Sequence, residues 1–422
     1  MNSDRSKSSA IPAENKLRLD SIDILRGLAA LSVALYHIWG HDGSYGFISN
    51  GLVPQTPNPT VFTYLISPLR WGYLGVSLFL VLSGFCIHLP YARKKYSKGS
   101  YEFKGSVFFT RRIWRLYPAY IIAVLVTAGL LKAATFFPAT HVAEHFPIPT
   151  IWDVVSHLTM LHGFLENQFY SIASVFWSLS LEFQLYLAYP LFLLAFRKRG
   201  VGNSIVFFIA LSFVWRYVAM HYLGGGLISV AAVGPYASMG CLPARMAEWL
   251  LGAFVAEVFA KHHAIGDSVK HFLGKRSLLI LLSVIFFGGA IATTLSEDLW
   301  IITDPLFGLS FASLIAGIIL PKIGAVHSNH PKFISGLFIK LGVISYSFYL
   351  IHSQLGWLVS VFVPSVEGSV SAFLIRMICL LISLIPIYYF FKWFEKPFLT
   401  APKPESRLYP IYAKLGNLLG VS

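Results

Sequence analysis

Charged residues are scarce in this chain, and their scarcity excludes an ordinary soluble domain. Only 12% of the 422 residues are Asp, Glu, Lys or Arg, whereas a soluble domain carries about 25%. Hydrophobic residues make up 56% of the sequence, aromatic residues 16%, and the mean hydropathy is +0.65. Aromatic side chains are enriched where helices meet the membrane interfaces. The composition therefore indicates a protein whose solvent is lipid.

Cysteine is also rare, and the basic residues form no separate domain. The three cysteines, Cys86, Cys241 and Cys379, lie in apolar stretches without the Cys-x-x-Cys or Cys/His spacing of a metal site. The net charge of +14 comes from basic residues that punctuate apolar runs, so we exclude nucleic acid as a partner. The first 20 residues are polar. We therefore expect no cleavable signal peptide, and the first apolar run is predicted to stay as a membrane anchor.

Apolar runs of bilayer length recur along the chain. A membrane-spanning helix needs roughly 20 mainly apolar residues, and the strands of a membrane barrel are about half as long. The sequence therefore predicts an all-α, polytopic transmembrane helix bundle with about ten spans. The predicted spans cover residues 21–40, 70–90, 112–135, 173–196, 203–222, 238–260, 277–295, 301–320, 339–363 and 369–394.

The connections between these spans alternate in basic charge. Lys and Arg precede the first span, are absent from 41–69, return at 93–112, are absent from 136–172, and keep alternating to the C-terminus. Connections rich in Lys and Arg stay in the cytoplasm, so both termini are predicted to be cytoplasmic. We expect one domain, with 1–20 as a cytoplasmic segment, 21–396 as the transmembrane domain and 397–422 as a cytoplasmic tail.

The first span carries the most informative charges, because ionisable side chains within a membrane are costly and usually functional. Asp23 and Arg26 lie near its cytoplasmic end, and His37 lies eleven residues beyond Arg26. At about 100° per residue, Arg26 and His37 return to one helix face, about 16 Å apart along the axis. The alternative is that Arg26 pairs with Asp23 for insertion and His37 sits at the interface. A metal pair of His37 with His41 lacks an evident third ligand, so no metal site is expected.

Two further groups suit the binding of a long, anionic ligand. Ser83 and Gly84 are small residues in the second span, where they let a helix or a thin ligand arm approach the backbone. Arg112 and Arg115 share a face at the cytoplasmic mouth of the third span, and arginine side chains suit phosphate oxygens. The alternatives are plain helix packing for the first pair and a snorkelling membrane anchor for the second.

Later spans carry a smaller set of polar candidates. Glu182 lies early in the fourth span, where it could pair with Arg216 or Arg245, hold His37, or contact a polar substrate. Arg245 and Glu248 are three residues apart and could satisfy each other. Tyr346, Tyr349, His352 and Ser353 make the ninth span polar, and His352 is open to interpretation as a satisfied core histidine.

These motifs, in this order, resemble the acyltransferase-3 family of membrane O-acyltransferases, and the resemblance covers nearly the whole chain. Arg26 and His37 match the family's Arg-x10-His pattern in LDSIDILRGLAALSVALYHI. The FLVLSGF run at 79–85 resembles its second motif, and Arg112 and Arg115 supply its Arg-x-x-Arg. WSLSLEFQLYLAYP resembles the Trp-Ser-Leu segment, with Glu-Phe-Gln where the family often has Glu-Glu-Gln. SYSFYLIH and FEKPF also resemble family segments.

The resemblance implies a multi-pass enzyme of the cell inner (plasma) membrane. Its donor would be acyl-CoA, most often acetyl-CoA, with no tightly bound cofactor. The acceptor would be a hydroxyl of a carbohydrate or glycolipid, such as lipopolysaccharide or exopolysaccharide, reached among membrane lipid.

In this reading the site residues have separate roles. Arg112 and Arg115 would hold the phosphates of the donor, and the pantetheine arm would pass Ser83 and Gly84. His37 would act as general base, since a neutral imidazole accepts a hydroxyl proton near pH 7; a covalent acyl-enzyme on Ser83 or His37 is the alternative. Arg26, oriented by Asp23, would order the cavity, hold the donor or stabilise an oxyanion. The alternatives are a secondary transporter that relays protons through buried charges and a membrane protein that only binds a glycan or lipid.

Overall fold

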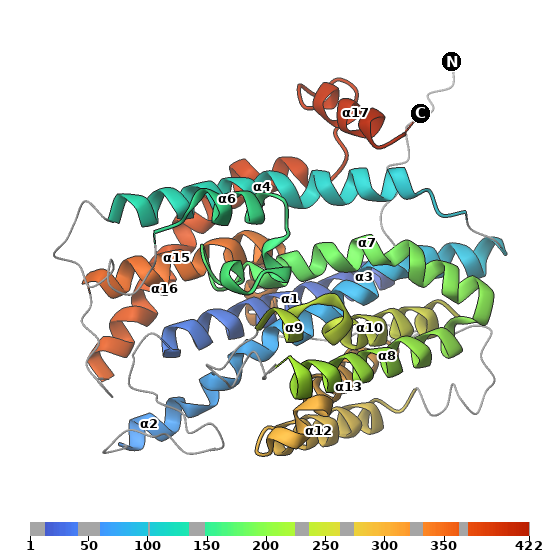
Figure 1. Ribbon diagram of the computed structural model, residues 1–422, viewed down its shortest axis with the longest axis horizontal. Helices are drawn as coiled ribbons and strands as arrows, with labels where there is room; N and C mark the ends of the chain where they lie inside the picture. Colours follow the sequence, from blue (N-terminus) through green and yellow to red (C-terminus); the bar gives the residue numbers. More distant parts are fainter. Residues whose placement is uncertain are drawn as a thin grey trace.

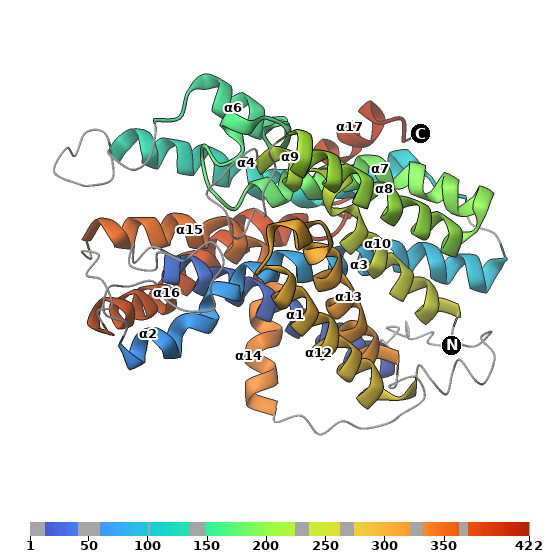
Figure 2. The ribbon, with the colours of Figure 1, turned by 60° about the horizontal axis from the view of Figure 1, so that its bottom comes forward.

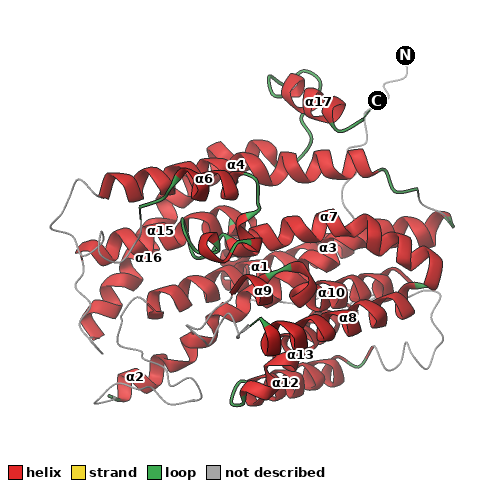
Figure 3. Cartoon of the chain, viewed as in Figure 1, coloured by secondary structure: helices red, strands yellow, loops and turns green. Residues whose placement is uncertain are grey.

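Every regular element in the described part of the chain is a helix. The computed structural model describes residues 13–40, 60–99, 102–134, 148–223, 236–261, 274–320, 332–362 and 370–421. No strand occurs among these residues (Figure 3). Most of the long helices lie side by side along the long axis of the molecule (Figure 1). The predicted all-helical polytopic bundle is therefore confirmed.

The long helices are α1 (Ala13–Gly40), α3 (Gly75–Lys98), α4 (Gly105–Ala134), α7 (Trp177–Arg199), α8 (Val201–Tyr222), α10 (Leu242–Lys261), α12 (Arg276–Thr293), α13 (Trp300–Ile319), α14 (Lys332–Val343), α15 (Ser345–Phe362) and α16 (Val370–Phe390). The shorter elements are α2 (Val61–Ile66), η1 (Ser67–Leu74), α6 (Ile151–Leu158), η2 (His162–Phe164), η3 (Glu166–Gln168), α9 (Tyr236–Gly240), η5 (Glu297–Leu299), η7 (Phe391–Glu395), η8 (Lys396–Phe398) and α17 (Tyr409–Leu418).

Most of the long helices are apolar enough to cross a bilayer. Eight such segments occur among the described residues, and nine if α14 and α15 form one bent span. Helix α10 has 20 residues but falls outside this count because it carries four charged side chains. Most of its side chains are nevertheless buried by neighbouring helices. The cytoplasmic orientation of both termini stays a prediction.

The ninth predicted span is broken rather than straight. Helices α14 and α15 meet at an angle of 81°, and α14 leaves the bundle across the direction of α15 (Figure 2). α14 crosses α1 so closely that a Cβ added at Gly342 would lie 1.9 Å from the carbonyl oxygen of Asp23. The chain therefore bends beside the end of α1 that carries Asp23.

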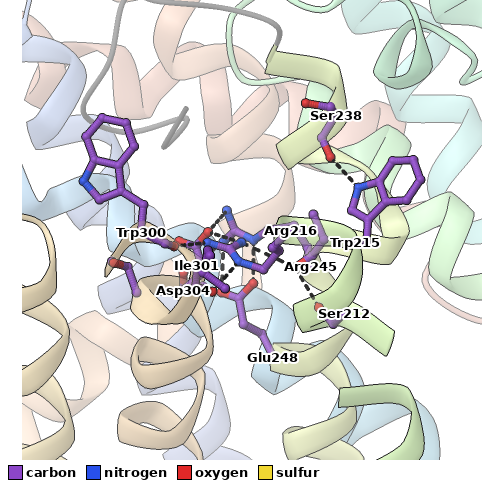
Figure 4. A network of polar contacts seen from close by, with 12 residues as sticks. Ser212, Trp215, Arg216, Ser238, Arg245, Glu248, Trp300, Ile301 and Asp304 are labelled. Atoms are coloured by element: carbon purple, nitrogen blue, oxygen red, sulfur yellow. Dashed lines mark hydrogen bonds and ion pairs between the residues drawn. The ribbon is translucent and has the colours of Figure 1, made fainter. Parts of the chain in front are cut away.

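A buried ion network joins α8, α10 and α13 (Figure 4). Arg216 is fully buried; it donates from Nη1 to Asp304 Oδ2 at 2.8 Å, from Nε to the Ile301 carbonyl at 2.7 Å, and from Nη2 to the Trp300 carbonyl at 2.6 Å. The two carbonyls belong to the first turn of α13, at Trp300–Ile319. Each of the three guanidinium nitrogens therefore has an acceptor within the protein.

Arg245 completes this network from α10. Its Nε and Nη2 donate to Glu248 at 2.5 and 2.9 Å, and its Nη1 lies 3.6 Å from Asp304. The pairing of Arg245 with Glu248 that their spacing suggested is therefore present. Two arginines face two carboxylates, so the network is balanced in formal charge. Such buried pairs are costly to break, because the remaining charge has no water to solvate it.

A short helical hairpin packs between α4 and α7. Helix α6 begins at a reciprocal cap, in which Asp153 N–H donates to Thr150 Oγ1 at 3.2 Å and Thr150 N–H donates to Asp153 Oδ2 at 2.7 Å. Further along, the rings of His157 and His162 stack at 3.9 Å, and both are fully buried. Burial, followed by the charge of His162, lowers the pKa of His157 to about 3, and burial lowers that of His162 to about 4. The pair is therefore neutral at physiological pH.

The C-terminal helix α17 lies outside the bundle, against α4 (Figure 1). Trp114 of α4 holds this segment: its ring contacts Tyr412 and Phe398 at 5.2 and 4.9 Å, and its Nε1 donates to the Thr400 carbonyl at 3.2 Å. Ile411 and Leu418 of α17 are exposed. Trp114 thus holds the segment that contains α17 against α4.

Candidate active site

His37 faces a second histidine that is remote in the sequence. His37 Nδ1 lies 2.8 Å from the Val33 carbonyl oxygen and 3.2 Å from Nε2 of His352, and the two rings are 5.1 Å apart. Its other nitrogen, Nε2, lies 3.5 Å from the hydroxyl of Ser174, just before α7. His37 is half-buried and His352 is almost fully buried. Nδ1 of His37 is therefore bonded within the bundle, and Nε2 faces the Ser174 hydroxyl.

Both histidines are held by their own helices. His37 follows Val33 by one turn of α1, and His352 follows Phe348 by one turn of α15, with Nδ1 at 3.0 Å from the Phe348 carbonyl oxygen. The ring of His352 also stacks on that of Phe348 at 5.7 Å. In each case the carbonyl four residues earlier accepts from Nδ1 and fixes the plane of the ring. The sequence marked His352 as polar but gave no sign that it meets His37.

Three arginines, Arg26, Arg112 and Arg115, gather near the end of α1 opposite His37. Arg26 of α1 and Arg112 of α4 both interact electrostatically with Arg115. Asp23 lies 3.9 Å from Arg26, and Glu395 at the end of η7 interacts electrostatically with Arg115 and Arg26. Asp23 and Glu395 offset only part of this positive charge. The cluster therefore suits an anion with several charges.

This geometry refines two expectations. Helix α4 begins at Gly105, seven residues before the predicted span, so Arg112 and Arg115 lie about two turns inside the helix. Arg26 joins them rather than His37, from which it is separated by about 16 Å of helix. The part that Arg26 plays stays a prediction.

Glu182 is held by hydroxyl groups rather than by an arginine. Ser83 Oγ donates to Glu182 Oε1 at 3.2 Å, and the Tyr186 hydroxyl donates to the same oxygen. Trp249 Nε1 in turn donates to Ser83 at 3.3 Å. The suggested partners of Glu182, Arg216 and Arg245, are instead bound by Asp304 and Glu248. Glu182 of α7 therefore faces α3 in the interior of the bundle.

Polar side chains connect the arginine cluster to the histidines. Arg112 lies over the ring of Tyr186 at 5.8 Å, and Tyr186 donates to Glu182. Glu182 interacts electrostatically with Tyr349, whose ring lies 5.8 Å from that of His352. These contacts, from α4, α7 and α15, form one continuous series through the bundle. Tyr186 and Tyr349 were not assigned as site residues from the sequence.

Comparison with known families decides the class of protein. The family model for an acyltransferase domain, acyltransferase 3, matches residues 19–393. The chain belongs to the acyltransferase-3 family. It is a multi-pass membrane acyltransferase, and the arginines and histidines described above all lie within the matched region.

Relatives of this acyltransferase come from different organisms. It is 27% identical over 335 residues to a putative acetyltransferase, ORF330, of Acidianus two-tailed virus, covering 78% of this chain and 80% of the relative. It is 25% identical over 351 residues to the acyltransferase MdmB of Streptomyces mycarofaciens, covering 80% and 78%. It is 27% identical over 337 residues to the O-acetyltransferase OatA of Staphylococcus aureus, covering 75% of this chain and 51% of OatA. No solved structure matches the chain.

The structure bears on two further expectations, the role of Gly84 and the metal site. Gly84 packs against α10, where an added Cβ would lie 1.9 Å from the Trp249 carbonyl oxygen. That contact accounts for its small size, and a part in donor binding stays a prediction. No group of three or more His, Cys, Asp or Glu side chains is placed to hold a metal within the described part of the chain. His41 lies outside the described residues.

Proposed function

We propose that this acyltransferase moves an acyl group, preferably acetyl, from acyl-CoA to a hydroxyl group of a glycan. The supporting observation is the arrangement along α1. Arg26, with Arg112 and Arg115, marks one end of a polar series, and His37 marks the other. A CoA thioester has the matching order, with phosphates at one end, a thin arm between, and the reacting carbonyl at the other end.

The arginine cluster binds the donor phosphates in this proposal. Arginine forms paired, charge-assisted hydrogen bonds with phosphate oxygens. Ser83, Glu182 and Tyr186 lie beside the arm, where their polar atoms already engage one another. With the arm laid along this series, the thioester carbonyl reaches the neighbourhood of His37.

His37 supplies the base. Its Nε2 removes the proton from the acceptor hydroxyl while that oxygen attacks the thioester carbonyl. The tetrahedral intermediate then collapses, the carbon–sulfur bond breaks, and the departing thiolate takes the proton back from His37. The products are an ester and free CoA, and the histidine returns to its neutral form. A general base of this kind contributes about 10²–10⁴ in rate.

Two considerations support a glycan as the acceptor in this proposal. His37 lies at the end of α1 that is predicted to face away from the cytoplasm, where surface glycans and glycolipids are accessible. Among the relatives, OatA is an O-acetyltransferase. We propose the plasma membrane as the location and a surface polysaccharide or lipopolysaccharide sugar as the acceptor.

The test is direct transfer by the full-length protein. The chain is reconstituted in liposomes with acetyl-CoA labelled in the acetyl group, and with glycolipids extracted from cells that lack the gene. We expect alkali-labile label in the glycolipid fraction. Label that appears only as intact acetyl-CoA inside the liposomes would identify a transporter, and no label in either place would contradict the proposal. Mass spectrometry of surface glycans from cells with and without the gene would then identify the acyl group and its sugar.

A further inference from the structure

We propose that His352 is a positioning residue that fixes which nitrogen of His37 is basic and stabilises the protonated ring during transfer. This inference rests on the proposed function of His37. It is carried by the hydrogen-bond geometry of two rings that come from α1 and α15. His352 does not touch the reacting atoms; it acts through His37.

The proton positions follow first for His352. Its Nδ1 lies 3.0 Å from the Phe348 carbonyl oxygen. A carbonyl only accepts hydrogen bonds, so Nδ1 of His352 carries a proton. In a neutral imidazole the other nitrogen then carries a lone pair, and this is Nε2, which points toward His37 at 3.2 Å.

The same reasoning fixes His37. Its Nδ1 lies 2.8 Å from the Val33 carbonyl oxygen and 3.2 Å from the lone pair of His352. Both partners accept, so Nδ1 of His37 carries a proton that the two acceptors share, an arrangement common in helices. A protonated Nε2 on His352 would face this N–H and be repelled. The neutral His352 is therefore the state that fits both bonds.

The consequence for catalysis falls on the opposite side of the His37 ring. With its proton on Nδ1, neutral His37 keeps its lone pair on Nε2, the nitrogen that faces the Ser174 hydroxyl at 3.5 Å. When Nε2 accepts the proton of the substrate, the ring becomes cationic and its Nδ1–H becomes a stronger donor. The hydrogen bond to His352 is then charge-assisted and about twice as strong as before. His352 thus stabilises the imidazolium without carrying a charge itself.

Several other titratable groups lie on the elements that pack against α1. Helix α1 packs against η1, α3, α14, α15 and α16, and α14 crosses it at the other end, beside Asp23. The relevant residues are Arg70 and Tyr73 on η1, Tyr349 and His352 on α15, and Arg376 on α16. Of these groups, His352 bonds His37, with 3.2 Å between Nε2 and Nδ1, and Tyr36 of α1 packs its ring edge-on against His37 at 5.3 Å.

Two substitutions separate this role from simple packing. His352→Gln keeps an amide oxygen near the place of Nε2 and can still accept from His37. His352→Leu fills similar space and accepts nothing. His221→Leu is the matched control, because His221 on α8 is exposed and has the same Nδ1 bond to the carbonyl four residues earlier, at 3.0 Å. All three variants are compared with the wild type after reconstitution.

We expect H352L to lower kcat about tenfold to a hundredfold, the range typical of partners that orient a functional histidine. KM for the donor stays unchanged. In wild-type protein the rate falls in acid as His37 becomes protonated. Without the acceptor the imidazolium is less stable, so the acid limb of the pH–rate profile moves to lower pH by about one unit, as for one lost charge-assisted hydrogen bond. H352Q retains most of the rate, and H221L behaves as wild type.

A second measurement needs no turnover. Diethyl pyrocarbonate modifies only unprotonated imidazole, so the pH dependence of its reaction with His37, followed by mass spectrometry of the peptide, reports the titration of that ring. The midpoint moves to lower pH in H352L if the inference holds. An unmoved midpoint together with an unmoved acid limb would overturn it. If the wild type shows no acyl transfer, the proposed function fails, and the labelling midpoints still decide the role of His352.

Discussion

Gly84 of α3 lies directly against the backbone carbonyl of Trp249 in α10, so that a Cβ added at position 84 would be 1.9 Å from the oxygen. The contact is reciprocal, because a Cβ at Gly252 would lie 1.9 Å from the Val81 carbonyl oxygen. Two helices therefore touch through their backbones at two points. Ser83 and Trp249, which reach Glu182 through hydrogen bonds, are adjacent to this contact.

Substitution of either glycine by alanine should separate α3 from α10. We expect Gly84→Ala and Gly252→Ala each to lower the free energy of unfolding by about 1–3 kcal/mol, the usual effect of overpacking, and to lower activity in proportion to folded protein. Gly288→Ala is the control, because no atom lies within 4 Å of an added Cβ there. Thermal unfolding in detergent measures the effect. Equal melting temperatures for G84A and G288A would show that the contact is not tight.

The arginine cluster should affect the donor more than the chemistry. Arg112→Ala combined with Arg115→Ala should raise KM for acetyl-CoA by about tenfold or more, since each charge-assisted hydrogen bond contributes about 1.5–3 kcal/mol, with a smaller change in kcat. Arg26→Ala should act in the same direction. Arg111→Ala is the control, because it removes the same charge from an exposed position on the same helix.

The choice of donor sharpens that experiment. S-acetyl-pantetheine carries the thioester and arm of the donor but lacks the nucleotide phosphates. The KM penalty of the double arginine variant should disappear with this short donor. A penalty of the same size with both donors would place the phosphates elsewhere.

His37 should carry the proton transfer. We expect His37→Ala to lower kcat by about 10²–10⁴, while donor affinity and yield of folded protein stay near wild type, because the side chain is only half-buried. Acylated product is measured in membranes with matched expression. Product at the wild-type level would remove His37 from the mechanism.

Acid should destabilise the protein through the stacked histidines of the hairpin between α4 and α7. The pKa values of His157 and His162 are lowered to about 3 and about 4, below the ordinary value of about 6.5. Below pH 6.5 the unfolded chain therefore binds protons that the folded chain does not. Stability is lost from about pH 6.5 downward and continues to fall to about pH 4 and below, by about 2 kcal/mol for each histidine between pH 6.5 and pH 5.

Variants without these titrations should lose less stability in acid. His157→Asn keeps a donor toward the Asp153 carbonyl, which His157 Nδ1 meets at 2.7 Å, and His162→Gln keeps one toward the Phe176 carbonyl. The measurement is the difference in melting temperature between pH 7 and pH 5, with exposed His221→Asn as the control. An equal difference in wild type and variants would exclude the stacked pair as the cause.

The sequence predicted the parts of the fold that depend on local composition. The length of the apolar runs predicted helices. Helices α8 and α13 begin and end within two residues of the predicted spans 203–222 and 301–320. The break between α14 and α15 was not predicted, because the span from 339 to 363 reads as one apolar run. Next to the break, Gly342 of α14 lies against the backbone of Asp23 in α1, a contact between segments far apart in the chain.

The sequence likewise predicted only those parts of the candidate site that lie within single helices. Arg26, His37, Arg112 and Arg115 were found because their spacing within single helices can be read directly. His352 was seen only as a polar residue, since its partner lies 315 positions earlier. Asp304 was not noticed, although it binds Arg216 across 88 positions. Interactions between distant helices leave no periodic signal in one sequence, so they appear only in the folded bundle.

The charges buried between α8, α10 and α13 also constrain how the chain is assembled during synthesis. An isolated helix that carries a guanidinium is poorly tolerated in lipid, and α8 with Arg216 emerges from the ribosome 88 residues before Asp304. Until Asp304 is made, we expect α8 to stay with the insertion machinery or beside helices already inserted. We therefore expect α8 to settle into its final contacts only after α13 enters the bilayer, and a chain truncated before Asp304 to be degraded faster than the whole chain.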